Sequence, residues 1–281
     1  MRRAAAAVLA VLGAVLPALA VTSWWAYGEA TETARFTRTA QPLATDPAVQ
    51  RAVADELVAT ADARLRAAAA AVPGGTAAVQ SRVRAAARAL VTSQAYRRAW
   101  LATQRTVHAR LASRLAGNVD APLTLDLDRV AAVLRTRLAA LGLPQVARAL
   151  ENPPPVTLAD RRQVQRAHDA AETVRVIRAV SIPAAVLALV GVVLTAASLP
   201  AGLLRVAACL AVSTVLVVAG RAVARQQIAN RDTSGGVAVA VYDVLSRPLR
   251  TWVIAGAGAA VLLGAAGAVA HGARAGAARR R

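Results

Sequence analysis

The run from residue 179 to residue 220 reads AVSIPAAVLALVGVVLTAASLPAGLLRVAACLAVSTVLVVAG, and Arg205 is its only charged residue. A bilayer core of about 30 Å needs about 20 helical residues, and an arginine at its centre costs at least about 2.5 kcal/mol. The run is therefore long enough to cross a membrane twice if Arg205 lies between the crossings. It predicts a transmembrane helical hairpin whose tight turn is at Arg205, with Ser198, Pro200 and Gly202 just before it.

The second half of this hairpin is short for a membrane span. Val206–Gly220 has 15 residues, so the span needs residues 201–204 as well. Arg205 and Arg221 would then extend their side chains toward opposite headgroup layers, as long basic side chains near span ends do.

Two further apolar runs complete the set of spans. Ala4–Gly28 has no charged residue, and Thr251–Ala273 has only the ionisable His271. The chain is 57% hydrophobic, but its apolar residues gather in these runs instead of spreading as a globular core requires. The expected fold is an all-α membrane protein with four transmembrane helices and an extracytoplasmic helical domain between spans one and two.

Arginines near the span ends predict the orientation. Cytoplasmic span ends collect basic residues, and the relevant positions all fall on one side of a four-span chain: Arg2, Arg3, Arg205, Arg274, Arg279, Arg280 and Arg281. We therefore expect a multi-pass plasma-membrane protein with both termini in the cytoplasm. The 21 arginines between residues 29 and 177 do not contradict this, because long loops translocate largely regardless of charge.

The short loop 221–250 conflicts with this orientation, because it holds five arginines against Asp232 and Asp243. We keep the orientation because both termini and the hairpin turn agree. Trp24, Trp25, Tyr27 and Trp252 would then lie at the outer interface, where aromatic belts form.

The first span has a second interpretation as a cleaved signal peptide. Arg2 and Arg3 would be its basic start, and Ala18-Leu19-Ala20 has the form of a cleavage site. The uncharged run continues eight residues beyond Ala20 and ends in aromatic residues, which favours an anchor. Either interpretation exports the segment that follows.

Helical spacing dominates the exported segment. Asp46 and Pro47 predict a helix start, with the apolar face Val49, Val53, Leu57, Ala61 and Leu65 continuing until Pro73-Gly74-Gly75. A second helix is expected over 77–91 and a third, capped by Ser93, up to Gly117-Asn118. Residues 124–127 are too short to predict a strand, and Asp126 or Asp128 should cap a helix ending at Gly142.

The last exported helix is expected to start at Leu158 with Thr157 as its cap and to run directly into span two, with a kink at Pro183. Loop 221–250 should contain a short amphipathic helix after Gly235-Gly236, although its alternating valines also fit a hairpin. The expected organisation is an anchor (1–28), an extracytoplasmic helical domain (29–177), the hairpin (178–220), the extracytoplasmic loop (221–250), the fourth span (251–273) and a basic cytoplasmic tail (274–281).

The stretch FTRTAQPLATDPAVQ at residues 36–50, just after an N-terminal span, resembles a family of uncharacterised four-span integral membrane proteins from actinobacteria. The resemblance extends over nearly the whole chain, in order, through Ser93, Tyr96, Trp100, Arg105, His108 and Leu111, residues 123–127, and Tyr242-Asp243. It implies an architecture with an extracytoplasmic helical domain, and it transfers no activity, catalytic residue or ligand.

Tyr96, Trp100, Arg105 and His108 are the candidate contact residues, because Arg105 and His108 share a helix face about one to two turns from Trp100. A pH-sensitive contact at His108 competes with a structural role as a partly buried histidine. His168 with Asp169 and Glu172 could flank a metal, but no second histidine lies four residues away, so we expect no metal site.

Small residues at four-residue spacing predict close helix packing on two spans. They are Ala10, Ala14 and Ala18 on the first span and Gly256, Ala260 and Gly264 on the fourth. We expect them to pack within the bundle, with a homodimer as the alternative. Cys209 lies inside span three and is expected to be a small packing residue.

We identified no P-loop, HExxH or G-x-S-x-G motif, and the spans place no ionisable group at membrane depth, which argues against ion-coupled transport. One Cys and three His exclude a disulfide framework. We expect no catalytic residue and no cofactor. The net charge of +19 comes from arginines at the predicted cytoplasmic span ends and from arginines on the exported surface. This distribution favours anionic lipids or acidic wall polymers over nucleic acid as partners.

The leading hypothesis is a non-enzymatic membrane protein whose exported domain is a contact or sensing module at the cell envelope, with the lipid bilayer and a membrane or envelope protein as partners. An accessory subunit of a transport or export complex is the alternative. An extracytoplasmic hydrolase is a weaker third hypothesis, because no nucleophile and base can be paired.

Overall fold

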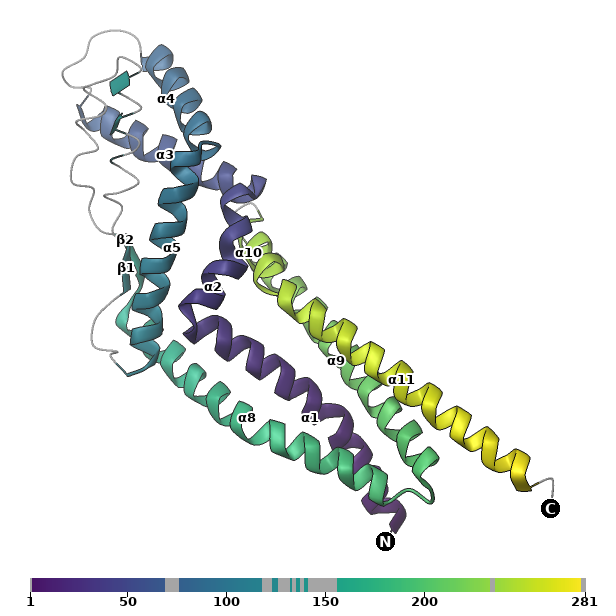
Figure 1. Ribbon diagram of the computed structural model, residues 1–281. Helices are drawn as coiled ribbons and strands as arrows, with labels where there is room; N and C mark the ends of the chain where they lie inside the picture. The colour runs from purple at the N-terminus through teal and green to yellow at the C-terminus, as the bar shows by residue number, and fades with distance from the viewer. Residues whose placement is uncertain are drawn as a thin grey trace. The chain divides into compact units, whose positions relative to one another are not determined.

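The computed structural model describes residues 2–68, 76–117, 123–125, 132, 135–136, 139–140, 156–232 and 236–278. It divides into two compact units (Figure 1): unit 1 holds Met1–Glu29, Asp169–Gln227 and Ser246–Arg281, and unit 2 holds Ala30–His168 and Ile228–Leu245. The elements are α1 (Arg2–Thr31), α2 (Thr33–Ala40), the 3-10 helix η1 (Gln41–Thr45), α3 (Pro47–Ala68), α4 (Thr76–Val91), α5 (Gln94–Leu115), β1 (Leu123–Leu125), β2 (Val156–Ala159), α8 (Arg161–Leu194), α9 (Leu199–Arg231), α10 (Val237–Leu245) and α11 (Arg247–Ala278).

Four helices are long and apolar enough to cross a membrane: Ala4–Thr31 of α1, all of α8 and α9, and Arg247–Ala273 of α11. Their outward surfaces carry exposed leucine, valine and isoleucine, such as Leu187 and Ile254, as expected where lipid replaces water. The prediction of a mainly helical chain with four candidate spans is therefore confirmed. These helices make up most of unit 1.

The helices of unit 1 approach one another closely at small residues. A Cβ built on Gly191 of α8 would lie 3.0 Å from Leu9 Cδ2 of α1, and one on Gly13 of α1 would lie 3.3 Å from Cys209 Sγ of α9. Cys209 is buried, and its Sγ lies 3.5 Å from the Ala10 carbonyl oxygen. Helix α1 thus packs against both arms of the α8–α9 hairpin.

The hairpin turn lies earlier than the sequence suggested, and its prediction at Arg205 was wrong. Helix α8 ends at Leu194 and α9 begins at Leu199, with Pro200 in the first turn, where a missing N–H costs nothing. Arg205 lies inside α9, and its Nη1 donates to the Thr195 carbonyl oxygen at 3.4 Å. The Arg205 backbone need not lie in the turn, because the long Arg205 side chain reaches back from α9 to the turn.

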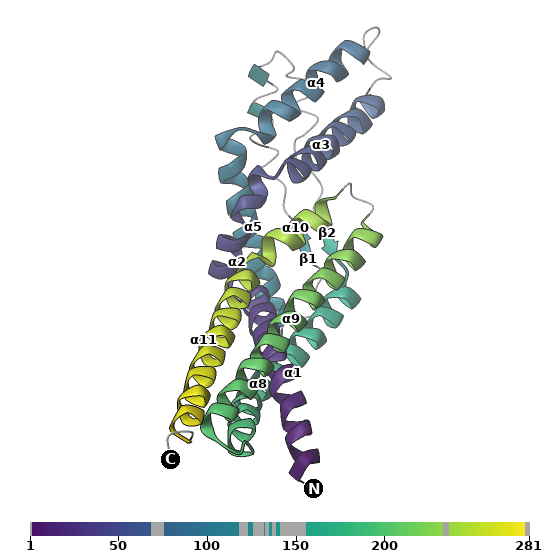
Figure 2. The same cartoon turned by 90° about the vertical axis from the view of Figure 1, so that its right-hand side faces the viewer.

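The predicted helix starts in unit 2 are confirmed at α3 and α5. Asp46 Oδ1 accepts from the backbone N–H of Ala48 at 2.9 Å, with Pro47 as the first helical residue of α3. Helices α3, α4 and α5 then enclose a core of Ala54, Val58, Ala87, Val91 and Tyr96. Helices α3 and α4 lie side by side in both views (Figures 1 and 2).

Ser93 caps α5 by accepting a hydrogen bond from the Tyr96 backbone N–H at 3.1 Å. Ser93→Ala leaves that N–H without its partner, so we expect a loss of about 1 kcal/mol in the free energy of unfolding of unit 2. Thermal unfolding followed by circular dichroism in detergent micelles measures this loss. An unchanged midpoint would mean that the cap contributes nothing.

The strand pair β1–β2 corrects two predictions. Leu123–Leu125 pairs antiparallel with Val156–Ala159, so residues 124–125 are in a strand and Thr157 caps no helix. Helix α8 instead begins at Arg161 behind Asp160, whose Oδ1 accepts from the Gln163 N–H at 2.7 Å while Gln163 Oε1 accepts from the Asp160 N–H at 2.9 Å. This reciprocal cap is a stronger helix start than Thr157 offers.

Loop 221–250 is more helical than expected. Helix α9 continues past Gly220 to Arg231, because no proline or glycine interrupts residues 221–231. Residues 237–245 form helix α10 and not a hairpin, and Val244 is buried among residues of α2, η1 and α3. The predicted helix ending at Gly142, its caps Asp126 and Asp128, and the side chains of Arg2, Arg3, Arg279, Arg280 and Arg281 lie outside the described residues.

Candidate functional site

Four polar or aromatic side chains form a row along one face of α5, at intervals of four residues. They are Tyr96, Trp100, Gln104 and His108, and this spacing places them one above the other on a helix. Tyr96 is 2% exposed and His108 is 3% exposed, while Trp100 and Gln104 are half-buried. We call these four residues the polar row.

The Tyr96 end of the polar row lies in the core that α3, α4 and α5 enclose. The ring of Tyr96 lies 5.7 Å from that of Trp100, tilted by 38°. The surrounding side chains Ala54, Val58 and Val91 are apolar, and this burial raises the pKa of the Tyr96 phenol well above its ordinary value. The phenol is therefore a neutral hydrogen-bonding group at physiological pH.

At the other end of the polar row, His108 contacts two residues of α2. The imidazole of His108 stacks on Phe36, with ring centroids 4.2 Å apart and an interplanar angle of 18°. His108 Nδ1 lies 3.1 Å from Thr33 Oγ1. Both contacts fix the ring orientation, so a structural role of His108 is directly visible.

Three atoms of the polar row are buried and have no hydrogen-bond partner among the described residues: Tyr96 Oη, Trp100 Nε1 and Gln104 Oε1. Each such atom costs about 1–3 kcal/mol relative to a partnered one. Two of the side chains, tyrosine and tryptophan, can donate and the glutamine oxygen accepts. The hydrogen-bonding chemistry of the row therefore suits an uncharged polar group or water.

Helices α2, η1 and α10 cover the polar row from one side. Trp100 packs against the cluster that Ala40, Leu43 and Val244 of these three elements form with Val49 of α3. Along the chain, one residue separates α1 from α2 and one residue separates α10 from α11. Two of the helices that cover the row, α2 and α10, are thus each one residue away along the chain from a candidate span.

The sequence found three members of the polar row and missed one. Arg105 does not belong to it, because its side chain is exposed while His108 is buried. Gln104 was missed although it continues the spacing of four from Tyr96 and Trp100. Glutamine is common on exposed helix faces, so only the packing of α5 shows that this one is covered.

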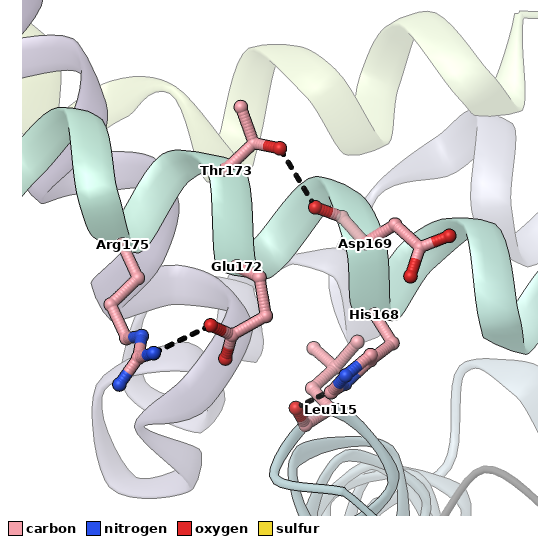
Figure 3. A network of polar contacts seen from close by, with 6 residues as sticks. All are labelled: Leu115, His168, Asp169, Glu172, Thr173 and Arg175. Atoms are coloured by element: carbon pink, nitrogen blue, oxygen red, sulfur yellow. Dashed lines mark hydrogen bonds and ion pairs between the residues drawn. The ribbon is translucent and has the colours of Figure 1, made fainter.

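His168 has a structural partner. Its Nδ1 donates to the Leu115 carbonyl oxygen at 2.8 Å, at the end of α5 (Figure 3). On the same helix, Arg175 Nη2 and Glu172 Oε2 form an ion pair at 2.6 Å. Among the described residues, no group of three His, Cys, Asp or Glu side chains could hold a metal ion.

Replacing His168 removes the bond that ties the start of α8 to the end of α5. We expect His168→Ala to lower the free energy of unfolding of unit 2 by about 1 kcal/mol, and His168→Gln to restore part of it because the amide N–H can donate. Urea unfolding followed by circular dichroism compares the three proteins. Equal stability of all three would show that the bond is not formed in solution.

The small-residue stripe on the fourth span faces α9. A Cβ on Gly256 would lie 3.0 Å from Thr214 Oγ1, and one on Gly264 would lie 3.8 Å from Ala207 Cβ; Ala260 between them is buried. On α1, Ala14 and Ala18 are buried and Ala10 packs against the cluster of Val192, Val206 and Cys209. A second close contact on α11 was missed: a Cβ on Gly267 would lie 3.0 Å from Leu204 Cγ and 3.1 Å from the Pro200 carbonyl oxygen.

Aromatic and basic side chains meet at one end of unit 1. Trp24 of α1 and Trp252 of α11 are in edge contact, with ring centroids 5.3 Å apart. The guanidinium carbon of Arg178 lies 4.5 Å from the centroid of the Tyr27 ring. The residues predicted to form an aromatic belt are thus close together.

Comparison of the chain with protein-family models, with curated proteins and with solved structures found no match. The resemblance to an actinobacterial four-span family therefore stays a prediction.

Proposed function

We propose that this chain is a non-enzymatic plasma-membrane protein with both termini in the cytoplasm, whose unit 2 acts on the extracytoplasmic side as a contact or sensing module of the cell envelope. One observation carries the proposal. Three polar atoms of the polar row are buried and have no hydrogen-bond partner in the described part of the chain, beneath helices that lead directly into candidate spans.

The unpartnered atoms favour any state in which they gain hydrogen bonds. With about 1–3 kcal/mol for each atom, a bound partner that supplies these bonds gains a free energy comparable to typical allosteric coupling. A protein that only had to be stable would lose nothing by replacing these groups with apolar ones. Their presence in an alanine-rich unit is therefore better explained by binding than by stability.

A change at the polar row has a short path along the chain to the spans. Glu32 alone separates α1 from α2, and Ser246 alone separates α10 from α11. Partner binding that moves α2 or α10 would therefore act on the ends of α1 and α11. The proposed receiver of such a signal is a protein that contacts the spans.

Site-specific photo-crosslinking in native membranes tests the proposal. A photoreactive residue replacing Arg105, exposed on α5, should give one discrete protein adduct, and the same residue replacing Arg84, exposed on α4, should not. The adduct should weaken in a Tyr96→Phe, Gln104→Met protein, which no longer needs a partner for those atoms. Adducts with lipid alone, or the same adducts from both positions, would contradict the proposal.

The alternative, an accessory subunit of a transport or export complex, was favoured by the small-residue stripes of α1 and α11. The neighbours of Gly256 and Gly264 within the chain are on α9, so these residues are already engaged. The same contacts remove the feature that favoured a homodimer. Co-purification with an ATPase or a permease would revive the alternative.

A further inference from the structure

Unit 1 collects arginines at the ends of its apolar runs. Arg175 and Arg178 precede the run that begins at Ala179, Arg221 and Arg225 follow the run that ends at Gly220, and Arg247 and Arg250 precede the run that begins at Thr251. Among the unit 1 arginines whose side chains are described, Arg205 alone is not in this group. We call the six residues the arginine collar.

The depth of the arginine collar is marked by aromatic rings. Arg178 lies over the ring of Tyr27, and Trp24 contacts Trp252 two residues beyond Arg250. Tryptophan and tyrosine concentrate at the level of the lipid headgroups. The collar therefore lies where phosphate groups of a bilayer would be, whichever leaflet that is.

The charge of the arginine collar is not balanced within unit 1. The unit has three acidic residues, Glu29, Asp169 and Glu172. Glu29 is 7% exposed, and Glu172 is already paired with Arg175. Six arginines against these three carboxylates leave a net positive surface at the membrane interface.

Two members of the collar are available for a ligand. Arg247 and Arg250 are exposed on the first turn of α11, and neither forms a hydrogen bond or ion pair with any described residue. Arg221, by contrast, donates from Nε to Ser246 Oγ at 3.0 Å. A guanidinium group matches two phosphate oxygens at once, so this pair suits phosphodiester groups.

We propose that the arginine collar binds the headgroups of anionic phospholipids, with Arg247 and Arg250 as its principal contacts. The occupant is lipid because the collar borders three apolar runs at the depth of the aromatic rings, where headgroups are the anions present at highest density. This binding would hold unit 1 at a defined depth and would favour membranes rich in anionic lipid. It does not depend on the function proposed for unit 2.

Quenching of tryptophan fluorescence by brominated lipids measures the binding, because Trp24, Trp25 and Trp252 lie near the collar. The full chain is reconstituted in vesicles of phosphatidylcholine and phosphatidylglycerol, with one lipid brominated at a time. The quenching should give a binding constant for phosphatidylglycerol above that for phosphatidylcholine. An Arg247→Gln, Arg250→Gln protein should lower this ratio about fivefold for each arginine removed.

The matched control is an Arg84→Gln, Arg88→Gln protein, which removes two exposed arginines from α4 in unit 2 and should leave the ratio unchanged. Salt at about 1 M should reduce the wild-type preference strongly, because it shortens the screening length to about 3 Å. Equal binding of the two lipids, or equal loss in both variants, would overturn the proposal. Equally tight binding of soluble polyphosphate in vesicles of neutral lipid would also overturn it, by showing a general anion surface.

Discussion

Replacing Gly267 by leucine should destabilise the packing of α11 on α9 by about 1–3 kcal/mol or more. A Cβ at this position would lie 3.1 Å from the Pro200 carbonyl oxygen, and a backbone atom cannot rotate away as a side chain can. The added side chain must therefore push the two helices apart. Unfolding in mixed detergent micelles, followed by the fluorescence of Trp252, measures the loss.

Gly258→Leu is the matched control, because a Cβ there meets nothing within 4 Å and the residue is exposed. It adds the same side chain to the same helix and should change stability little. If both variants unfold like the wild type, α11 does not pack on α9 at Gly267 as described. If both lose stability equally, the loss does not come from the contact at Gly267, and it does not come from helix propensity either, because leucine is the better helix former.

Replacing Tyr96 by phenylalanine should stabilise unit 2 by about 1–3 kcal/mol, which is unusual for a change at a buried site. The phenol oxygen is buried with no partner among the described residues, so removing it relieves a desolvation cost and leaves the ring contacts in place. Ser93→Ala, three residues earlier, also removes a hydroxyl but one that caps α5. The two changes should therefore shift thermal unfolding in opposite directions.

The pH dependence gives a second measurement on the same variant. Burial raises the pKa of the Tyr96 phenol in the folded state, so above about pH 10 the unfolded chain loses this proton while the folded chain keeps it. Wild-type stability should therefore fall with rising pH relative to Tyr96→Phe, which lacks the group. Parallel curves for the two proteins, or a destabilised Tyr96→Phe protein, would mean that the phenol has a partner in solution.

The sequence predicted the spans well, because uncharged runs of about 20 residues have few other uses. It also located the helix starts at Asp46 and Ser93, where a capping side chain comes directly before the apolar pattern. It misplaced the α8–α9 turn, because the prediction followed the charge of Arg205 and not the helix-start signal of Pro200. The flexible Arg205 side chain can reach the turn from inside α9. It also missed β1–β2, whose pairing is a non-local contact that local spacing does not reveal.

The candidate site could be predicted only in part. Tyr96, Trp100 and His108 were singled out as aromatic or ionisable residues on one helix, but their burial depends on α2 and α10, which are far away in the sequence. Gln104 and Gly267 carry no signal of their own. Gln104 continues the four-residue spacing of Tyr96 and Trp100, and Gly267 lies three residues beyond Gly264. Only the neighbouring elements show what these two positions contact.

The topology is the central claim, and labelling with a membrane-impermeant thiol reagent on intact cells tests it most directly. In a Cys209→Ala background, one cysteine replaces Ala109, exposed on α5, or Ala197, exposed in the α8–α9 turn. We predict labelling of Ala109→Cys in intact cells and labelling of Ala197→Cys only after lysis. Labelling of Ala197→Cys in intact cells, with Ala109→Cys protected until lysis, would contradict the account.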